Sequence, residues 1–462
     1  MRELRVLILA AGKGTRMKSR KAKVLHHAGG APLIHHVLAA AQKLSPDVWI
    51  VAGHQAEKLR EILPDGKFVL QNEQLGTGHA VMQAREPFDG YTGDLLILPG
   101  DVPLISAETL QHFVRFHRDG GYSASVLSAD VGNPAGYGRI VRRGDEVSAI
   151  VEHQDATPEI LQISEINSSI YVFHAPALFE ALTKVRNANA QLEYYLTDVI
   201  GILEAQQKKV GGFKAAQSEE VLGINTRKEL VAIDRAMRRR KCDQLMADGV
   251  TIVDPESTFI DAAVEIGPDT VIHPSVQIYG RTVIGDDVTI HSFSRISNSK
   301  IGSNVSILDG SVVVDSTLGN DVSVGPYAHL RMHTKLEDGV KVGNFVEIKK
   351  STLGEGTKAM HLAYLGDATI GKKVNIGAGT ITCNYDGVNK HPTIIEDGVF
   401  IGSDSQLVAP VRIGRDAYVG AGSSITEDVP SESLAVARGR QVNKVGWVRD
   451  RKKKEKFQPG QS

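Results

Sequence analysis

The chain has 462 residues, and at about 150 residues per domain this length predicts two or three domains, or a repeat array joined to a globular domain. Its 53 Lys and Arg residues nearly balance 54 Asp and Glu residues, so no net charge favours a nucleic-acid partner or an anionic membrane surface. Two cysteines cannot form a disulfide framework or a zinc site alone, and they indicate a reducing compartment, with the cytoplasm as the default.

The first half of the chain alternates short apolar runs with helical patterns. The run 6–11 is shorter than the core of a signal peptide and leads directly into Gly12, so it predicts a buried strand. No run of about 18 apolar residues is present, so no membrane span is expected. The alternation predicts an α/β domain over 1–229 with a Rossmann-like, mostly parallel sheet covered on both faces. The expected strands are 6–11, 48–52 and 95–98, and the expected helical segments are 32–44, 80–85 and 109–116.

A connecting helix is predicted between this domain and the rest of the chain. Residues 228–248 are helix formers with a basic centre, and Gly249 follows as a stop signal. We place the connecting helix at 230–250. Its basic residues, 238–241, are interpreted as a solvated face.

After Asp254 the sequence becomes periodic. Aliphatic-glycine pairs recur from Ile266-Gly267 to Val419-Gly420, at separations that cluster near multiples of six. This hexapeptide repeat predicts a parallel β-helix over 251–437, in which three units make one coil of 18 residues. A polar tail, 438–462, follows.

The longest break in this period lies between Ile376 and Ile401, which are 25 residues apart. Residues 383–392 fill the excess. An insertion into a regular coil is expected to project as a loop, and loops on repeat scaffolds often form binding sites.

The loop after the first predicted strand has features of an anion site. In Leu9-Ala10-Ala11-Gly12-Lys13-Gly14-Thr15-Arg16-Met17, two glycines let the backbone approach an anion and two cations supply charge. The loop matches neither standard nucleotide fingerprint, because Met17 replaces the last glycine of G-x-G-x-x-G. Spacing alone leaves open phosphate binding or a plain strand-to-helix turn.

This loop closely resembles the L-A-A-G-x-G-T-R-M loop of nucleoside-diphosphate-sugar pyrophosphorylases. With the hexapeptide half, nearly the whole chain resembles the family of bifunctional bacterial N-acetylglucosamine-1-phosphate uridylyltransferases/glucosamine-1-phosphate N-acetyltransferases. The resemblance implies a left-handed β-helix, a homotrimer with acetyl-transfer sites at subunit contacts, and synthesis of UDP-N-acetylglucosamine, a precursor of peptidoglycan and lipopolysaccharide. Further matching segments are 23–25, 71–80, 100–104, 136–140, 151–153, 165–167 and 223–225.

For the first half, the resemblance implies transfer of uridylyl from UTP to N-acetylglucosamine-1-phosphate with release of pyrophosphate. Asp101 and Asn225 would hold Mg²⁺, and Arg16 and Lys23 would act on the triphosphate. Without the resemblance, Asp101 is read as a strand cap and Asn225 as a turn residue. The remaining nucleotide and sugar positions are implied to be Leu9, Ala10, Ala11 and Gly12 in the loop, Gln71, Gly76 and Thr77 at uracil, Pro99 and Gly100 beside the metal, and Gly138, Glu152 and Asn167 at the sugar.

Three positions depart from the family pattern. Ala22 stands where Pro is frequent, Pro99 where an aromatic residue is frequent, and Ser168-Ser169 where Thr-Gly is usual. Pro99 removes a backbone donor and fixes φ beside Asp101. We expect altered nucleotide affinity and retained activity.

For the second half, the resemblance implies acetylation of glucosamine-1-phosphate by acetyl-CoA, with His361 as general base. Glu347, fourteen residues earlier, is predicted to orient its imidazole. Cys383 is interpreted as a bystander, and Arg440 leaves the choice of Arg438 open. The other implied residues are Arg331 and Lys349 at the phosphate, Tyr364 and Asn375 at the sugar, and Ala378, Asn384, Tyr385, Ser403, Ala421 and Arg438 at acetyl-CoA.

Two other classes of function compete with this interpretation. A nucleotidyltransferase could carry a β-helix that serves only oligomerisation or regulation. The presence of His361, Lys349, Tyr364 and the Asn384-Tyr385 insertion argues against that alternative. A non-catalytic relative could act as an interaction subunit. The presence of Arg16, Lys23, Asp101 and Asn225 argues against this alternative.

Overall fold

The computed structural model describes residues 2–456. They form two compact units, divided between Lys241 and Cys242. The division falls inside helix α8 (Arg227–Ala247), which lies where a connecting helix was predicted. Within the described residues, no helix is long and apolar enough to cross a membrane.

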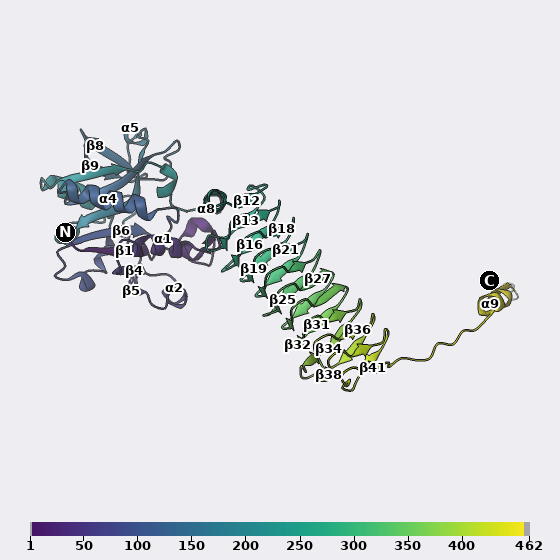
Figure 1. Cartoon of the computed structure of the whole chain (residues 1–462). Coiled ribbons are helices and arrows are strands. Elements are labelled where there is room, and N and C mark those ends of the chain that lie inside the picture. The colour runs from purple at the N-terminus through teal and green to yellow at the C-terminus, as the bar shows by residue number, and fades with distance from the viewer. Residues whose placement is uncertain (1, 457–462) are drawn as a thin grey trace. The chain divides into compact units, whose positions relative to one another are not determined.

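The first unit is built on one twisted sheet (Figure 1) with the strand order β11-β7-β10-β6-β1-β4-β5. The predicted α/β fold is confirmed, but the sheet is mixed rather than mostly parallel. Strands β6, β1, β4 and β5 are parallel, whereas β10 runs antiparallel to both of its neighbours. The strands are β1 (Leu4–Ala10), β4 (Val48–Ala52), β5 (Lys67–Leu70), β6 (Asp94–Pro99), β7 (Ala124–Asp130), β10 (Glu165–His174) and β11 (Val210–Lys214), with a small separate pair β2 (His27–Ala28) and β3 (Ala31–Pro32).

A hairpin of β8 (Arg139–Arg143) and β9 (Glu146–Val151) attaches to this sheet through β10. Its segment lacks the continuous apolar run that marks the parallel strands, so the sequence pattern did not predict it. The hairpin and β10 supply the antiparallel half of the sheet.

Helices cover both faces of the sheet, as predicted. Along β1, Val6 and Ile8 pack into one core with α1 and α4, while Leu7 packs into the other core with α3, α6 and α7, since successive side chains of a strand point to opposite faces. The helices of this unit besides α8 are α1 (Leu33–Gln42), α2 (Ala56–Ile62), α3 (Thr77–Met82), α4 (Ala107–Asp119), α5 (Pro158–Leu161), α6 (Ala175–Leu182) and α7 (Asp198–Ala205).

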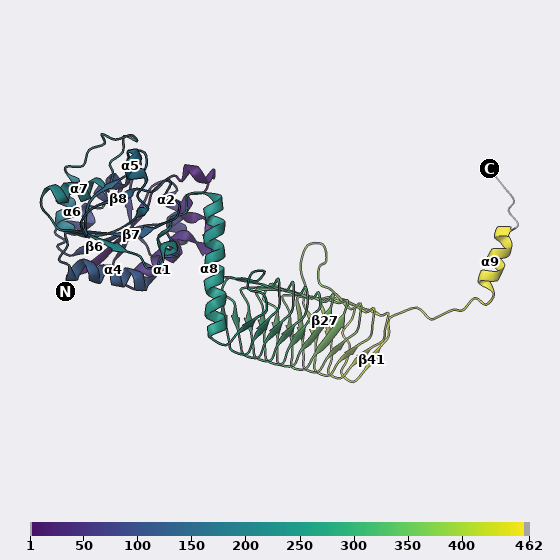
Figure 2. The ribbon, with the colours of Figure 1, turned by 90° about the horizontal axis from the view of Figure 1, so that it is seen from above.

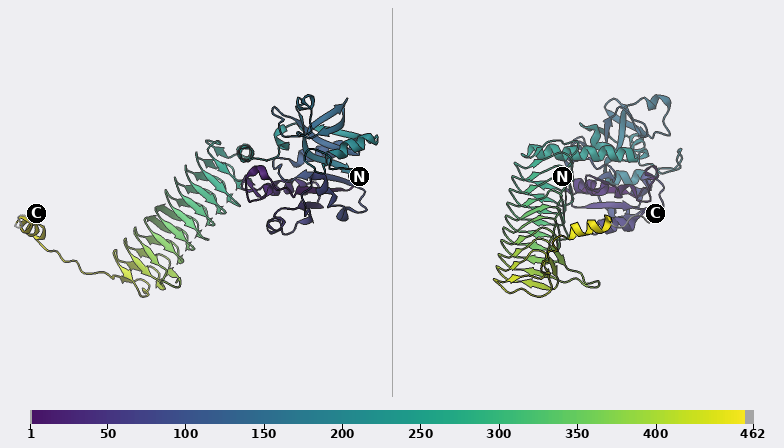
Figure 3. Two further views of the ribbon diagram at one scale, coloured as in Figure 1. Left: turned by 180° about the vertical axis from the view of Figure 1, so that it is seen from behind. Right: turned by 90° about the vertical axis from the view of Figure 1, so that its right-hand side faces the viewer.

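The second unit is the predicted parallel β-helix (Figures 1 and 3). Short strands from β12 (Thr251–Ile252) to β41 (Leu434–Ala435) form three parallel sheets of eleven, ten and nine strands. Each strand pairs with the strand one coil later, which stacks aliphatic side chains inside the coil. One such inward ladder is Ile272, Ile290, Ile307, Val324, Val342, Ala359, Ile376, Ile401 and Val419.

One loop projects from the side of this stack (Figure 2), in the yellow-green of residues near 385. It corresponds to the predicted insertion, and Tyr385 and Lys390 form an antiparallel bridge across it. The tail contains helix α9 (Trp447–Lys456), and its last residues, 457–462, lie outside the described part.

Candidate active sites

The predicted metal and triphosphate residues meet at the carboxyl ends of β1 and β6. Asn225 Oδ1 accepts hydrogen bonds from Lys23 Nζ at 3.1 Å and from Arg16 Nη2 at 2.8 Å. Lys23 Nζ also forms an ion pair with Asp101. Residues more than 200 positions apart therefore converge on one point, with the two predicted metal ligands facing the same ammonium group.

Local backbone contacts hold these side chains. Gly100 N–H donates to the Leu9 carbonyl at 2.9 Å, and Ile224 N–H donates to the Asp101 carbonyl at 3.1 Å. Gly14 has φ +61°, and a Cβ there would lie 2.7 Å from Lys23 Cβ. The absence of a side chain at Gly14 therefore lets Lys23 approach this loop, which explains the second glycine of the Gly-x-Gly pattern in terms of space.

Glu229, at the start of α8, fixes Asn225 from the other side. Its Oε2 accepts the backbone N–H of Asn225 at 2.6 Å and that of Thr226 at 2.9 Å. A carboxylate at a helix N-terminus satisfies donors that the helix leaves open. The backbone of Asn225 is thus held in place, and its amide oxygen faces Lys23 and Arg16.

The implied uracil residues also lie together. Gln71 is buried, and its Nε2 contacts the Gly76 carbonyl at 3.1 Å and His79 Nδ1 at 3.0 Å. Gly76 has φ +107°, and a Cβ there would lie 2.6 Å from the Tyr194 carbonyl oxygen. Thr77 Oγ1 accepts the Leu196 N–H at 3.0 Å. His79 is a neighbour of this group that the sequence motif contained but that we did not assign.

The implied sugar residues form a third group, beside β10. A Cβ on Gly138 would lie 3.4 Å from Glu152 Oε2 and 3.5 Å from Asn167 Cβ. Asn167 N–H donates to the Gly138 carbonyl at 2.9 Å. Burial raises the pKa of Glu152, partly offset by a hydrogen bond from Thr197 Oγ1 at 3.3 Å.

The three departures from the family pattern have local structural settings. Pro99 ends β6 opposite Leu9, and Ala22 is buried and donates its N–H to Gln55 Oε1 at 2.9 Å. Ser168 and Ser169 lie where the register of β10 against β7 shifts. Ser169 adopts φ +60°, a conformation that glycine adopts more easily.

On the β-helix, the predicted base and three predicted acetyl-CoA residues form one column. Ala359, Ile376, Ile401 and Val419 are register partners in successive coils. Two residues further along in each coil stand His361, Ala378, Ser403 and Ala421. One corner of the coil therefore carries these four residues one above another.

Asn344 precedes His361 in this column, because the two are register partners on adjacent coils. Its Oδ1 lies 2.7 Å from His361 Nδ1. With Asn344 as acceptor, the proton resides on Nδ1 and the Nε2 lone pair is left to take a proton from substrate. Asn344 was not predicted from the sequence, although it lies three residues before Glu347.

The predicted role of Glu347 is wrong in this structure. Glu347 is in register with Tyr364, not with His361. Its Oε1 accepts from Arg331 Nε at 2.8 Å and from Arg331 Nη2 at 2.6 Å. Glu347 therefore orients the implied phosphate residue Arg331, and Asn344 orients the imidazole.

Lys349 and Arg331 are register partners on neighbouring strands, β25 (His329–Arg331) and β28 (Glu347–Lys349). The pKa of the buried Lys349 is lowered, first by its side-chain contact with Lys390 and then by burial. Lys390 comes from the inserted loop. The fold thus brings together three cations, which suits a dianionic phosphate, and the third of them was missed in the sequence because only the folded loop places it there.

The rest of the implied residues surround this corner. Asn384 is buried and donates to Asp367 Oδ2 at 2.5 Å, while Tyr385 is exposed. Arg438 Nη1 donates to the Ala421 carbonyl at 2.5 Å, which places Arg438 against the column. Tyr364, Asn375 and Cys383 are half-buried.

Comparison with known proteins agrees with this two-part organisation. The MobA-like NTP transferase domain matches residues 6–189, the GMPPB C-terminal domain matches 255–342, and six repeats of the bacterial transferase hexapeptide match 392–427.

Curated relatives match almost the whole chain. A protein of Koribacter versatilis is 48% identical over 98% of this chain and 98% of its own length. A protein of Thermotoga petrophila is 51% identical over 98% and 100%, and one of Geobacillus sp. is 50% identical over 96% and 97%. Each carries the name bifunctional protein GlmU. The chain therefore belongs to the GlmU family of bifunctional proteins.

Proposed function

We propose that this chain makes UDP-N-acetylglucosamine in two steps. Residues 251–437 would acetylate glucosamine-1-phosphate with acetyl-CoA, and residues 1–229 would transfer uridylyl from UTP to the product, with 230–250 as the connecting helix. The convergence of Arg16, Lys23, Asp101 and Asn225 at one point supports the nucleotidyl step. The column of His361 with three implied acetyl-CoA residues supports the acetyl step.

The first site fits a magnesium ion. Asp101 and Asn225 already direct a carboxylate and an amide oxygen at one cation, the ammonium group of Lys23, and these are the ligands that Mg²⁺ prefers. When bound, Mg²⁺ would neutralise phosphate charge as pyrophosphate leaves. Arg16 and Lys23 would hold the triphosphate so that a phosphate oxygen of the sugar attacks the α-phosphorus in line.

In the second site, His361 Nε2 would take a proton from the ammonium group of glucosamine-1-phosphate, which frees the nitrogen lone pair to attack the carbonyl carbon of the acetyl thioester. When the tetrahedral intermediate collapses, the carbon-sulfur bond breaks, the nitrogen gives up its second proton to solvent, and CoA takes the proton held by His361 and leaves as the thiol. Arg331, Lys349 and Lys390 would hold the phosphate. The Ala378 backbone N–H would stabilise the developing oxyanion.

A homotrimer is part of this proposal. Phe293, Tyr327, Phe345 and Leu362 project from one corner of the β-helix, and they are 73%, 58%, 56% and 62% exposed. Tyr327 and Phe345 stack at 5.7 Å between ring centroids. Such an exposed apolar ridge is typical of an interface, and Leu362 directly follows His361, so a subunit contact would adjoin the acetyl site. Because UTP and acetyl-CoA are cytoplasmic substrates, we also propose a cytoplasmic location.

The alternative is a single-function nucleotidyltransferase with a structural β-helix. A thiol-release assay with acetyl-CoA and glucosamine-1-phosphate distinguishes the two proposals. We expect the wild type to release thiol and His361→Ala to lose at least about 100-fold in rate. His291→Ala, a matched control four coils earlier, should keep the wild-type rate. A folded wild type without thiol release would favour the alternative, provided that it releases pyrophosphate from UTP and N-acetylglucosamine-1-phosphate.

A further inference from the structure

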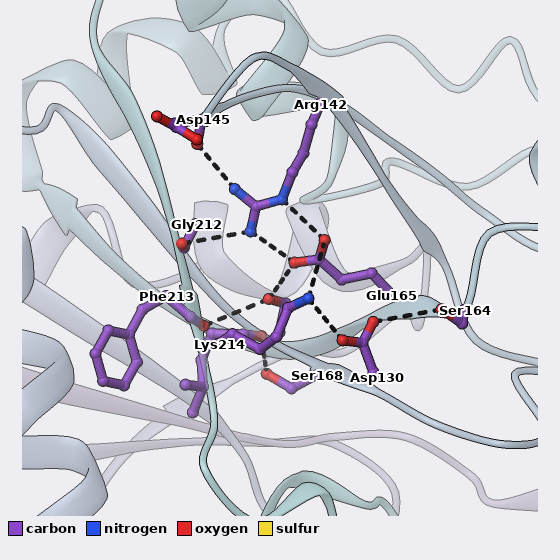
Figure 4. Close-up of polar contacts among 11 residues, drawn as sticks. Asp130, Arg142, Asp145, Ser164, Glu165, Ser168, Gly212, Phe213 and Lys214 are labelled. Atoms are coloured by element: carbon purple, nitrogen blue, oxygen red, sulfur yellow. Dashed lines mark hydrogen bonds and ion pairs between the residues drawn. The ribbon is translucent and has the colours of Figure 1, made fainter.

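An ion pair in the first unit lies outside the residues assigned to substrate (Figure 4). Arg142 on β8 and Glu165 on β10 form a two-pronged contact, with Nε to Oε2 at 2.8 Å and Nη2 to Oε1 at 2.6 Å. The side chains are 26% and 10% exposed. This is the bidentate geometry that gives an arginine-carboxylate pair its strength and direction.

The surroundings complete the contact. Ser128 Oγ donates to Glu165 Oε1 at 2.6 Å, and Arg142 Nη1 donates to the Asp145 carbonyl at 2.8 Å. Burial alone would raise the pKa of Glu165, but hydrogen bonds from Arg142 and Ser128 and the charges of Arg142 and Lys214 lower it. These hydrogen bonds and ion pairs therefore stabilise the charged form of Glu165.

Glycine makes room for this pair on β11. A Cβ on Gly212 would lie 2.7 Å from Arg142 Nη2 and 2.7 Å from Val147 Cγ2. The Gly212 carbonyl is 3.4 Å from the same guanidinium nitrogen. Arg142 therefore links three strands, β8, β10 and β11, at one place.

The backbone attachment of the β8–β9 hairpin to the sheet is narrow. Its register with β10 consists of one residue pair, Ile166 with Arg139, and the Asn167 N–H bond to Gly138 lies beside it. Apolar side chains such as Val147 and Ile150 pack the hairpin into the core with α7. These contacts keep the hairpin folded, and Arg142, which lies nearer the hairpin tip, adds a second connection between the hairpin and β10 beyond that single bridge.

The same hairpin carries sugar-site residues at its base. Gly138 directly precedes β8, Glu152 directly follows β9, and Asn167 lies two residues after Glu165 on β10. A change in the hairpin angle would move Gly138 and Glu152 relative to Asn167. The uracil, metal and triphosphate residues lie on other elements and would move less.

We propose that the Arg142–Glu165 pair is a positioning element that sets the geometry of the sugar-binding half of the nucleotidyl site. The inference rests on the proposed function of the first unit. According to this inference, the pair supports the affinity of the site for N-acetylglucosamine-1-phosphate and does not affect its affinity for UTP.

The test is steady-state pyrophosphate release by full-length Arg142→Met, with the KM for each substrate measured separately. We expect the KM for N-acetylglucosamine-1-phosphate to rise about tenfold, because small displacements of positioning groups have effects of this order, and the KM for UTP to stay within about twofold. Arg142→Met/Glu165→Gln should resemble the single variant, since coupled residues are not additive. Arg143→Met is the matched control, because Arg143 on the same hairpin pairs with Glu204 at the surface with its side chain 79% exposed.

A purely structural pair would instead lower thermal stability and the active fraction, and hence kcat, without separating the two KM values. If the KM values for the two substrates are unchanged or equally raised in Arg142→Met, this inference is overturned, but the proposed function is not. If Arg142→Met does not fold, Gly212→Ala gives the same readout, since it displaces the guanidinium while keeping both charges. A folded wild type without pyrophosphate release would overturn the proposed function, and this inference with it.

Discussion

Asn344 Oδ1 lies 2.7 Å from His361 Nδ1, and the two residues are register partners on adjacent coils, β27 (Lys341–Asn344) and β30 (Lys358–His361). The repeat itself therefore orients the proposed base. The regular pairing of one coil with the next places the amide oxygen of Asn344 against Nδ1 of the histidine.

Replacing Asn344 with Ala should lower kcat for acetyl transfer by about 10- to 100-fold, because the imidazole loses its orienting acceptor. Asn344→Asp keeps an acceptor but adds negative charge, which favours the imidazolium. Its rate should recover at higher pH, with the acid limb of the pH profile displaced upward. A pH profile of thiol release measures both effects, and wild-type kcat in Asn344→Ala would contradict this role.

Glu347→Gln should act on substrate binding rather than on the base. Glu347 holds Arg331 through two hydrogen bonds to one oxygen, so the variant should raise the KM for glucosamine-1-phosphate severalfold and leave kcat within about threefold. The same assay on Asn344→Ala provides the contrast. Collapse of kcat at unchanged KM would restore Glu347 as the orienting group.

The sequence predicted the β-helix because its six-residue period is visible in the aliphatic-glycine pairs, whereas the column at one corner became clear only from the register of the coils. The same period could have identified Asn344, because it lies seventeen residues before His361, which is close to the 18 residues of one coil. Glu347 lies only fourteen residues before His361, and the prediction that this shorter separation makes one coil is wrong. Lys390 could not be found this way, since its position depends on how an irregular loop folds back. The hairpin β8–β9 and the antiparallel β10 were missed because long-range pairing determines them, and no local apolar period marks their partners.

Glu152→Gln should increase stability while weakening sugar binding. Burial raises the pKa of Glu152 in the folded protein. The protonated carboxyl therefore stabilises the fold fully at a pH below its ordinary pKa, and this stability is lost as the pH rises through the raised pKa. At neutral pH the variant escapes this loss and should unfold at a higher temperature than wild type, and the difference should vanish in acid. Thermal unfolding across pH tests the sign, and a higher KM for N-acetylglucosamine-1-phosphate should accompany it.

His117 should make the first unit sensitive to acid. Burial lowers its pKa to about 4, although the charge of Asp94 opposes the shift. The unfolded histidine titrates near 6.5, so stability is present above that pH and is lost as pH falls toward 4, by about 3 kcal/mol in total.

Tryptophan fluorescence can follow this loss in the first unit. The chain has two tryptophans, so Trp447→Phe leaves Trp49 on β4 as the reporter. Urea unfolding of that variant should show stability falling between pH 6.5 and 4, and adding His117→Asn should flatten the slope. An equal slope in both proteins would assign the acid sensitivity to other groups.

Lys390→Met tests whether the inserted loop completes the phosphate site of the acetyl reaction. Lys390 lowers the pKa of Lys349 by like-charge contact. The repulsion between these two adjacent cations is offset when an anion binds between them. The variant should raise the KM for glucosamine-1-phosphate about tenfold, in line with the loss of one charged contact to phosphate, and leave the KM for acetyl-CoA unchanged. Lys372→Met, at an exposed ion pair with Glu355 on the same unit, is the control. If the KM for acetyl-CoA rises instead, the loop lysine serves the cofactor side of the column, and the phosphate is held by Arg331 and Lys349 alone.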